Sequence, residues 1–359
     1  MGIRPRTSLL NPDLTRPSAL LSVPRNGNLI WLDKNENRDL ELIEELHKLF
    51  HEMSPVYLST YPEAKATYEK ISRWVGVSPE SLILTPGSDG AIRLVFEAFV
   101  GEKDHVIHTS PTFAMYPVYC QMFGAVQKTI EYERIDDKPF LDIEKILASI
   151  REVKPKLLCL PNPDSPTGTV IDSGLLIKIL KECEKTDTVF LIDEAYHPFY
   201  NWTAVPWIKE SPNLIVARTF AKAWGVAGLR IGYAVGQPDT IRYLHKMRPM
   251  YEVSTIAVEY ISKLLDKPEI MERSVARILE GKEFFLNEMR QLGFKVLSTH
   301  GNFIHVGFGN KAEKIHYSLS DKVYYRSSFK ENCLRGYSRF SVAPKSVMEK
   351  IVNWISESL

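Results

Sequence analysis

A lysine in an apolar turn is the first residue of this chain that could do chemistry. Lys222 stands in the run TFAKAWG (219–225), directly after the apolar stretch 214–217. A lysine that is partly desolvated and close to cations has a lowered pKa, and its neutral amine attacks carbonyl carbons. The apolar neighbours make an ordinary surface lysine the weaker interpretation. We therefore expect Lys222 to act as a nucleophile toward a carbonyl group.

Arg230 and Thr219, on either side of this lysine, have the chemistry of a phosphate site. A guanidinium is a fixed fork of donors that suits phosphate, and a threonine hydroxyl can donate to the same group. The run TPGSDG (85–90) offers a second contribution, because it precedes an apolar helix and helix N-termini bind phosphate well. Taken alone, this run is equally well explained by an ordinary N-cap at Ser88 or Asp89.

An acid at the end of a buried strand is the third candidate. Asp193 lies in the run LIDEAY (191–196). A carboxylate in such a place is costly unless it meets a cation. A protonated pyridine nitrogen is such a cation, and the contact would keep the ring protonated as an electron sink. A helix-capping or salt-bridged aspartate explains Asp193 equally well when the residue is considered by itself.

Alternating strands and helices must position these residues. The alternation predicts an α/β fold with a large domain built on a mainly parallel central sheet. The carboxyl ends of its strands are where open α/β sheets keep their ligands, and Thr219 and Lys222 fall there. The expected strands are Val106–His108, Leu157–Leu160, Val189–Ile192, Leu214–Ala217 and Ile231–Val235, with helices between several of them, for example Gly174–Lys185. Another helix is expected to begin near Ala91, before the first of these strands.

The two ends of the chain are expected to form a smaller α+β domain. We predict residues 1–50 as an N-terminal arm and part of the small domain, 51–250 as the large cofactor-binding domain, and 251–359 as the C-terminal small domain. The expected helices are Asp39–Met53, Glu63–Trp74, Ile256–Leu265, Ile270–Leu292 and Ser346–Ser356, and the expected strands of the second domain are Phe294–Leu297, Phe303–Val306, Val323–Arg326 and Arg339–Val342.

Composition excludes several classes of partner. Lys plus Arg number 45 and Asp plus Glu 44, so the formal charge of +1 does not favour nucleic acid or an anionic membrane. We expect no signal peptide, because the stretch 19–21 is short and lies between prolines, and no myristoylation at Gly2, because Arg6 stands where Ser or Thr is needed. Four scattered cysteines without a CxxC pair predict buried reduced thiols and a cytoplasmic protein.

Two weaker motifs are set aside. His47 and His51 have a spacing that can bind metal, but no third ligand is evident, so we predict a surface pair and no metal site. The run GFGNKA (307–312) fits GxGxxA, but no βαβ unit follows it. A turn is therefore the better interpretation than a dinucleotide site.

The order of the stronger motifs is more specific than any of them alone. A phosphate loop, the turn-rich run NPDSPTG (162–168), a buried aspartate and a lysine followed by an arginine occur in succession. In this order the sequence resembles the fold-type I pyridoxal phosphate (PLP) enzymes of aminotransferase class I/II, and within them the histidinol-phosphate aminotransferases most. The resemblance extends from Asn35-Glu36-Asn37 to the terminal helix.

The resemblance implies a role for each candidate residue. Lys222 would carry PLP as an internal Schiff base and move a proton at the substrate Cα. Asp193 would pair with the pyridine nitrogen, and Tyr196 would hydrogen-bond the phenolic oxygen. Ser88, Asp89, Thr219 and Arg230 would hold the phosphate.

The resemblance also implies a homodimer and a substrate site. Tyr61 matches a tyrosine that crosses the interface to the phosphate of the partner subunit. Phe113 stands where the family usually has a tyrosine stacked on the ring, and stacking is kept by a phenylalanine. Arg339 matches the arginine that binds a substrate carboxylate or phosphate, and Arg326 matches a second substrate-side arginine.

Three positions depart from the pattern. Ser165 replaces the asparagine that usually contacts the phenolic oxygen, Gly90 replaces a common glutamate, and Ala221 replaces a serine that often precedes the lysine. A serine hydroxyl could partly substitute for the asparagine. One phosphate contact of the family is absent if Ala221 contributes nothing.

The expected function is that of a transaminase of amino-acid metabolism. It would act on an amino acid or phosphorylated amine with a keto acid acceptor, as histidinol-phosphate aminotransferases do. Two alternatives stay open at this point: decarboxylation of a threonine- or serine-phosphate type substrate, and, more remotely, a PLP-fold protein that binds without catalysis.

Overall fold

The structure is a computed structural model, and it describes residues 5–12, 14 and 24–359. Gly2, the stretch 19–21 and much of the expected arm lie outside the described residues. The described part of the arm contains a 3-10 turn, Thr7–Leu10, whose Ser8 hydroxyl donates to the carbonyl of Met122 at 2.9 Å.

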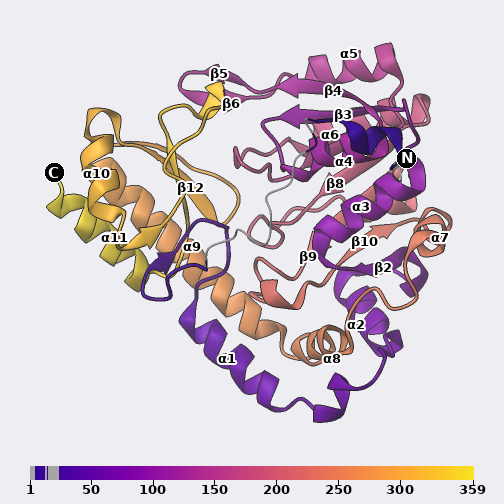
Figure 1. Cartoon of the computed structure of the whole chain (residues 1–359), viewed down its shortest axis with the longest axis horizontal. Helices are drawn as coiled ribbons and strands as arrows, with labels where there is room; N and C mark the ends of the chain where they lie inside the picture. Colours follow the sequence, from indigo (N-terminus) through magenta and orange to yellow (C-terminus); the bar gives the residue numbers. More distant parts are fainter. Residues whose placement is uncertain (1–4, 13, 15–23) are drawn as a thin grey trace, which may run out of the picture.

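A seven-stranded sheet forms the larger part of the molecule (Figure 1). Each neighbouring pair of strands is parallel except the two pairs that β10 makes, so the expectation of a mainly parallel α/β sheet is confirmed. The order across the sheet is β2 (Leu82–Thr85), β10 (Gly232–Gly236), β9 (Leu214–Thr219), β8 (Val189–Asp193), β7 (Leu157–Pro161), β3 (His105–Ser110) and β4 (Val126–Glu131).

Helices cover both faces of this sheet, as the burial of its strands requires. Strands β7, β8 and β9 are buried along their whole length, which is typical of a parallel sheet covered on both sides. Alternate residues of β8 belong to different apolar clusters: Leu191 packs with α3 (Gly87–Phe99), α4 (Met115–Phe123) and α7 (Pro238–Met247), while Ile192 packs with α5 (Ile143–Val153) and α6 (Ser173–Lys185).

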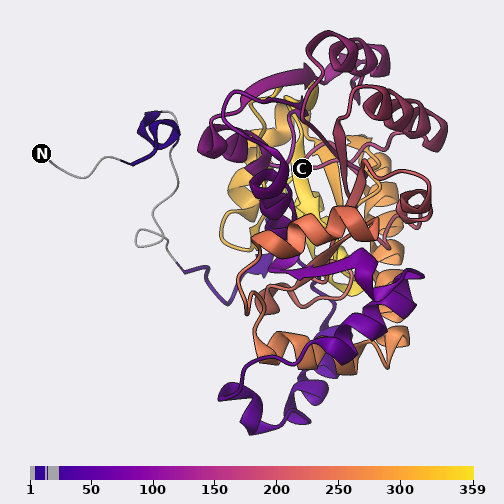
Figure 2. The same ribbon diagram turned by 90° about the vertical axis from the view of Figure 1, so that its right-hand side faces the viewer.

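The C-terminal part is a smaller α+β arrangement, as expected. Figure 2 shows it behind the helices that cover the large sheet. Its antiparallel sheet has the order β11 (Lys295–Leu297), β12 (Phe303–Gly307) and β14 (Ser338–Ser341), and β1 (Ile30–Trp31) pairs in parallel with β13 (Val323–Tyr324). Its helices are α9 (Pro268–Gln291), α10 (Ala312–Leu319) and α11 (Lys345–Glu357), and α1 (Leu40–His51), α2 (Lys65–Val75) and α8 (Thr255–Leu264) lie beside them along the lower edge.

Two parts of the chain join in this small region. The β1–β13 pairing brings residue 30 beside residue 323. One apolar cluster continues from Phe190 under the large sheet to Ile355 in α11. The domain boundaries at residues 50 and 250 therefore stay predictions.

The structure corrects several expected elements. The helix expected near Ala91 begins at Gly87, so Ser88 and Asp89 lie in its first turn rather than before it. The strand expected over 323–326 ends at Tyr324. Strands β2, β4, β1 and the β5 (Glu133–Ile135) and β6 (Lys138–Phe140) hairpin were not predicted, since each is short or alternates little.

The two weaker motifs lie on α1 and directly before α10. His47 and His51 are exposed on α1, their rings meet edge to face at 4.4 Å, and the described residues hold no group of three or more metal-ligating side chains. The run 307–312 contains the short 3-10 helix Gly309–Lys311 and leads into α10. All four cysteines are free and buried. No described helix is long and apolar enough to cross a membrane.

A buried ion pair joins Arg218 in β9 to Glu194, the residue directly after β8. Glu194 accepts from Arg218 at 2.9 Å, from the Thr203 hydroxyl at 2.9 Å and from the Ala204 N–H at 2.7 Å. Both side chains of the pair are almost fully buried. Each charge therefore depends on the other for compensation.

Replacing Glu194 by Ala should leave the Arg218 charge buried without a partner. We expect Glu194→Ala to lower the free energy of unfolding by about 3–5 kcal/mol. Urea denaturation at one fixed protein concentration measures this change. Arg242→Ala, which removes an exposed pair with Asp239, is the control and should change it by less than about 1 kcal/mol. Equal effects of the two substitutions would contradict this account.

Candidate active site

A cavity of 370 Å³ lies at the carboxyl ends of β8 and β9. Segments that are far apart in the sequence meet there, because parallel strands end at the same edge of a sheet. Ten of the twelve residues predicted to bind cofactor or substrate line this cavity: Ser88, Asp89, Phe113, Ser165, Asp193, Tyr196, Thr219, Lys222, Arg230 and Arg339. Tyr61 and Arg326 do not.

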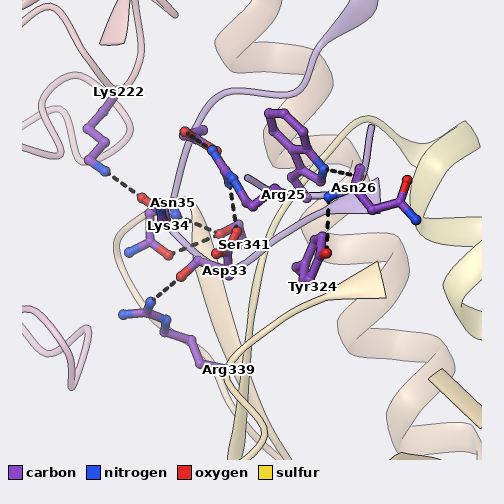
Figure 3. Close-up of polar contacts among 11 residues, drawn as sticks. Arg25, Asn26, Asp33, Lys34, Asn35, Lys222, Tyr324, Arg339 and Ser341 are labelled. Carbon is purple, nitrogen blue, oxygen red and sulfur yellow. Dashed lines mark hydrogen bonds and ion pairs between the residues drawn. The ribbon is translucent and has the colours of Figure 1, made fainter. Parts of the chain in front are cut away.

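Lys222 extends from the turn after β9 into the cavity. Its Nζ donates to the carbonyl of Lys34 at 2.9 Å (Figure 3). Burial lowers the pKa of Lys222 to about 8, and the nearby Arg339 guanidinium adds to the shift. A much larger fraction of this amine is neutral near pH 8 than of an exposed lysine. The lowered pKa therefore favours the neutral form of the Lys222 amine, which is the form that can act as a nucleophile.

Asp193 is a buried carboxylate without a cation. The N–H of Ala195 donates to its Oδ1 at 3.1 Å, and the hydroxyl of Tyr116 lies 3.4 Å from its Oδ2. Burial raises the pKa of Asp193 to about 7. Within the part of the chain that the structure describes, no Lys, Arg or His lies within ion-pair distance of it. A cationic ring nitrogen in the cavity would supply the missing charge.

The other end of the cavity has the donors of a phosphate site. Helix α3 has Pro86 at its N-cap and no side-chain cap, so the N–H groups of its first turn are open to an anion. The pairings of Gly232 with Thr85 and with Thr219 place this helix end beside β9. Thr219 lines the same end.

Two glycines allow the close approach of these segments. Gly87 has a φ of 76°, a backbone conformation that favours glycine, and a Cβ there would lie 3.0 Å from the Arg230 guanidinium. A Cβ on Gly232 would lie 2.5 Å from the carbonyl oxygen of Arg218 and 2.6 Å from the Gly87 carbonyl carbon. Larger residues would therefore separate Arg230 from the N-terminus of α3.

The carboxylate side chain of Asp89 is not a donor and does not suit a phosphate. Its carboxylate accepts from the Tyr119 hydroxyl at 2.8 Å. An anion near this position would be repelled by the carboxylate but attracted by the backbone N–H groups of the first turn. The N–H groups are accordingly the better donors at Ser88 and Asp89.

Two aromatic residues line the middle of the cavity. Phe113 meets Tyr116 edge to face at 5.8 Å. The Tyr196 hydroxyl accepts from Asn35 Nδ2 at 2.8 Å, and Ser165 lines the cavity too. Burial raises the pKa of Tyr196, so its hydroxyl stays protonated and can donate a hydrogen bond.

The two candidate substrate arginines are placed differently. Arg339 is 9% exposed, its Nη2 donates to the carbonyl of Asp33 at 2.7 Å (Figure 3), and its buried Nε has no hydrogen-bond partner. The backbone of Arg326 forms a β-bridge with that of Arg339. The Arg326 guanidinium, however, lies over the Phe329 ring at 4.0 Å and 3.7 Å from the Glu331 carboxylate, outside the cavity.

Tyr61 lies on the surface of the single chain. Its side chain is 73% exposed, and its ring stacks on Tyr251 at 4.2 Å. Nothing in one chain brings it into the cavity of that chain. Its predicted role depends on a second subunit.

Sequence reasoning assigned no role to the segment 33–37. Asn35 and Glu36 line the cavity, and Arg25 holds Glu36 through two hydrogen bonds of 2.8 Å. The hydrogen bonds from Arg25 lower the pKa of Glu36. The signal was the polar run DKNEN directly after the apolar run LIWL (29–32), because polar residues that follow a strand often lie at a site.

Comparisons with known proteins agree with this geometry. The sequence model of the family described as aminotransferase class I and II matches residues 27–355. Histidinol-phosphate aminotransferases of Caldanaerobacter subterraneus subsp. tengcongensis and Thermoanaerobacter pseudethanolicus are 32% and 34% identical to this chain, each over 91% of it and 92% of the relative.

Solved structures share the fold. Histidinol-phosphate aminotransferase from Sinorhizobium meliloti in complex with pyridoxal-5'-phosphate has a TM-score of 0.79 at 22% identity and covers 94% of this chain and 96% of its own. L-threonine-O-3-phosphate decarboxylase from Porphyromonas gingivalis has a TM-score of 0.74 at 20% identity and covers 92% and 99%. The expected fold type I is thereby confirmed.

The structural likeness alone does not separate transamination from decarboxylation, since both kinds of enzyme have this fold. The sequence relatives are more informative on this point, because both are aminotransferases and are more than 30% identical to this protein over 91% of the chain. With a family match over residues 27–355 and a lysine of lowered pKa beside a buried carboxylate at one cavity, this protein belongs to the class I and II aminotransferases.

Proposed function

We propose that this protein is a PLP-dependent aminotransferase that exchanges an amino group between an amino acid or phosphorylated amine and a keto acid. The observation that carries the proposal is the pair of Lys222 and Asp193 at one cavity. The pKa of Lys222 is lowered to about 8, and Asp193 has no cation beside it. PLP supplies an aldehyde for the amine and a pyridinium nitrogen for the carboxylate, and its ring accepts the electrons released at Cα.

The residues of the cavity fit each part of this cofactor. Asp193 would face the ring nitrogen and favour its protonated form. Phe113 would stack on the ring, while Tyr196 and Ser165 would donate to the phenolic oxygen. The N–H groups of Ser88 and Asp89, the Thr219 hydroxyl and Arg230 would hold the phosphate.

Lys222 has two tasks in this scheme. Its Nζ would hold the cofactor in the absence of substrate, and the free amine would take the proton from the substrate Cα. A neutral amine is required for both tasks, and the lowered pKa of Lys222 provides it near pH 8. Arg339 binds the substrate carboxylate or phosphate, with its Nε free to donate.

The substrate is proposed to be of the histidinol-phosphate class. This rests on the names of the relatives with more than 30% identity. These names do not favour the decarboxylase alternative, whose solved representative is 20% identical. Arg326 would join Arg339 at the substrate only if its guanidinium left Glu331.

We further propose a homodimer in the cytoplasm. The exposed ring of Tyr61 supports the dimer, since the family pattern sends this tyrosine to the phosphate of the partner subunit. Four buried thiols without a disulfide support a reducing compartment.

Lys222→Ala should abolish transamination and the absorption of a lysine-bound cofactor, because it removes the amine that is proposed to carry the cofactor; Lys34 also lines the cavity and is not expected to replace it. Borohydride reduction of the wild-type protein, followed by peptide mapping, should place the label on Lys222. A label on another lysine, or turnover by the variant, would refute the assignment. Unchanged circular dichroism controls for folding.

The reaction class is tested with histidinol phosphate and with threonine phosphate as amino donors. A keto product with transfer of nitrogen to 2-oxoglutarate is expected. Release of carbon dioxide without a keto product would instead identify a decarboxylase.

The rate at which cofactor-free protein takes up PLP should rise with pH. Only the neutral amine reacts, so the midpoint should lie at about 8, well below the value of about 10.4 for an exposed lysine. Normalising the rate to that of Nα-acetyl-lysine removes the titration of PLP itself. Arg339→Gln should shift the midpoint upward, because it removes a nearby positive charge. A wild-type midpoint near that of Nα-acetyl-lysine would contradict the prediction.

Tyr61 should act in the site of the partner subunit. Tyr61→Ala should weaken cofactor binding roughly tenfold, the value of one lost hydrogen bond. Mixing inactive Lys222→Ala protein with Tyr61→Ala protein should restore one complete site per mixed dimer. After full exchange of subunits, about a quarter of all sites should be of wild-type affinity. No restored high-affinity sites would mean that Tyr61 serves its own subunit.

A further inference from the structure

Asn35 is the centre of a buried hydrogen-bond network beside the cavity. It is 3% exposed, and its backbone has a φ of 54°, a left-handed conformation that asparagine and aspartate tolerate better than most residues. Its N–H donates to the Ser341 hydroxyl at 2.8 Å, and that hydroxyl lies 3.1 Å from Asn35 Oδ1 (Figure 3). The carbonyl of Asn35 accepts from Asn302 at 3.1 Å.

These contacts decide which way the Asn35 amide points. The N–H of Asn35 can only donate, so the Ser341 oxygen accepts there and its single proton goes to Asn35 Oδ1. A reversed amide would leave the proton of the fully buried Ser341 without that acceptor, which is costly. The amide nitrogen therefore faces Tyr196, to which it donates at 2.8 Å.

The direction of this bond sets the role of the Tyr196 hydroxyl. Its oxygen accepts from Asn35, so its own proton must point elsewhere. The Tyr196 ring cannot turn freely, because it meets Phe303 edge to face at 5.3 Å and a Cβ on Gly301 would lie only 3.0 Å from it. Tyr196 lines the cavity with Ser165, whose hydroxyl also lowers the Tyr196 pKa through a hydrogen bond, so the Tyr196 proton remains available to an acceptor in the cavity.

We propose that Asn35 is a positioning residue that fixes the Tyr196 hydroxyl as a hydrogen-bond donor toward the cofactor. This inference rests on the proposed function, in which Tyr196 donates to the phenolic oxygen of PLP. The fixed donor matters more here because Ser165, rather than an asparagine, stands on the other side of that oxygen. Asn35 acts through Tyr196 and does not contact the reacting atoms.

The consequence is measurable in the absorption of the bound cofactor. A donor at the phenolic oxygen draws charge from it, so that oxygen holds the proton on the Lys222 nitrogen less tightly. Loss of the Tyr196 donor should therefore raise the apparent pKa of the lysine-bound cofactor, which is the chromophore. One hydrogen bond to a charged group corresponds to a rise of about one pH unit.

The test is a double-substitution cycle with Asn35→Asp and Tyr196→Phe. The aspartate has the same shape, tolerates the backbone conformation and keeps the bond from Ser341, but it accepts the Tyr196 proton instead of donating. Spectrophotometric pH titration of the holoenzyme should show a rise of about one unit for Asn35→Asp. In the Tyr196→Phe background the same substitution should add no rise.

The cycle separates the proposal from a simple effect of charge. A carboxylate that acts through space would raise the pKa equally in both backgrounds, and that result would overturn the proposal, as would no rise at all. Asn37→Asp is the matched control, because Asn37 lies in the same segment but donates to Ala223 and Ser274. An equal shift in this control would also overturn it.

A variant that introduces no charge tests the same chain of contacts from Ser341 through Asn35 to Tyr196. Ser341→Ala frees the Asn35 amide to reverse, and it should raise the pKa in the same direction only when Tyr196 is present. No change in folded Ser341→Ala protein would contradict the orientation argument. Absence of a lysine-bound cofactor in the wild-type protein would overturn the proposed function. A wild-type cofactor spectrum that does not respond to the Asn35 substitutions would overturn the role of Asn35 alone.

Discussion

The burial of one carboxylate without a cation is the constraint on which the site depends. Asp193 ends a strand that is buried along its whole length, and Ala195 and Tyr116 satisfy only part of its hydrogen-bonding capacity. Isolated charges are expensive in such surroundings. The fold retains this cost at the carboxyl end of β8, next to the turn that carries Lys222. An acid and an amine with pKa values near 7 and 8 thus share a cavity that a cationic ring can complete.

The segment 33–36 connects the two ends of the chain at this cavity. Its carbonyls accept from Lys222 and Arg339, and Asn35 bonds to Ser341 on β14 and to Tyr196 after β8. Arg25 holds the same segment by pairing with Asp33 and Glu36. The segment therefore links the small sheet to the large one through polar contacts, over a core that is itself continuous.

Close approach of backbones, rather than side-chain chemistry alone, forms the phosphate end. Gly87 and Gly232 let α3 and β10 come together beside Arg230, and Pro86 leaves the first turn of α3 without a side-chain cap. By contrast, Arg326 and Arg339 are neighbours through their backbones, yet only Arg339 reaches the cavity. The backbone bridge therefore does not bring the two guanidinium groups to the same place, because the Arg326 side chain lies at Phe329 and Glu331.

The sequence by itself determined the parallel α/β fold, which follows from apolar runs that predict strands. Polar residues at the ends of those runs made Lys222, Asp193, Thr219 and Arg230 candidates, while the family and their expected roles came from the resemblance carried by the order of the motifs. Only the tertiary structure decided that Asn35 orients Tyr196, that Asp89 turns its carboxylate to Tyr119, and that Arg326 faces Glu331. The reason is physical: a hydrogen-bond direction or a side-chain orientation depends on partners up to three hundred residues away, which no local pattern contains.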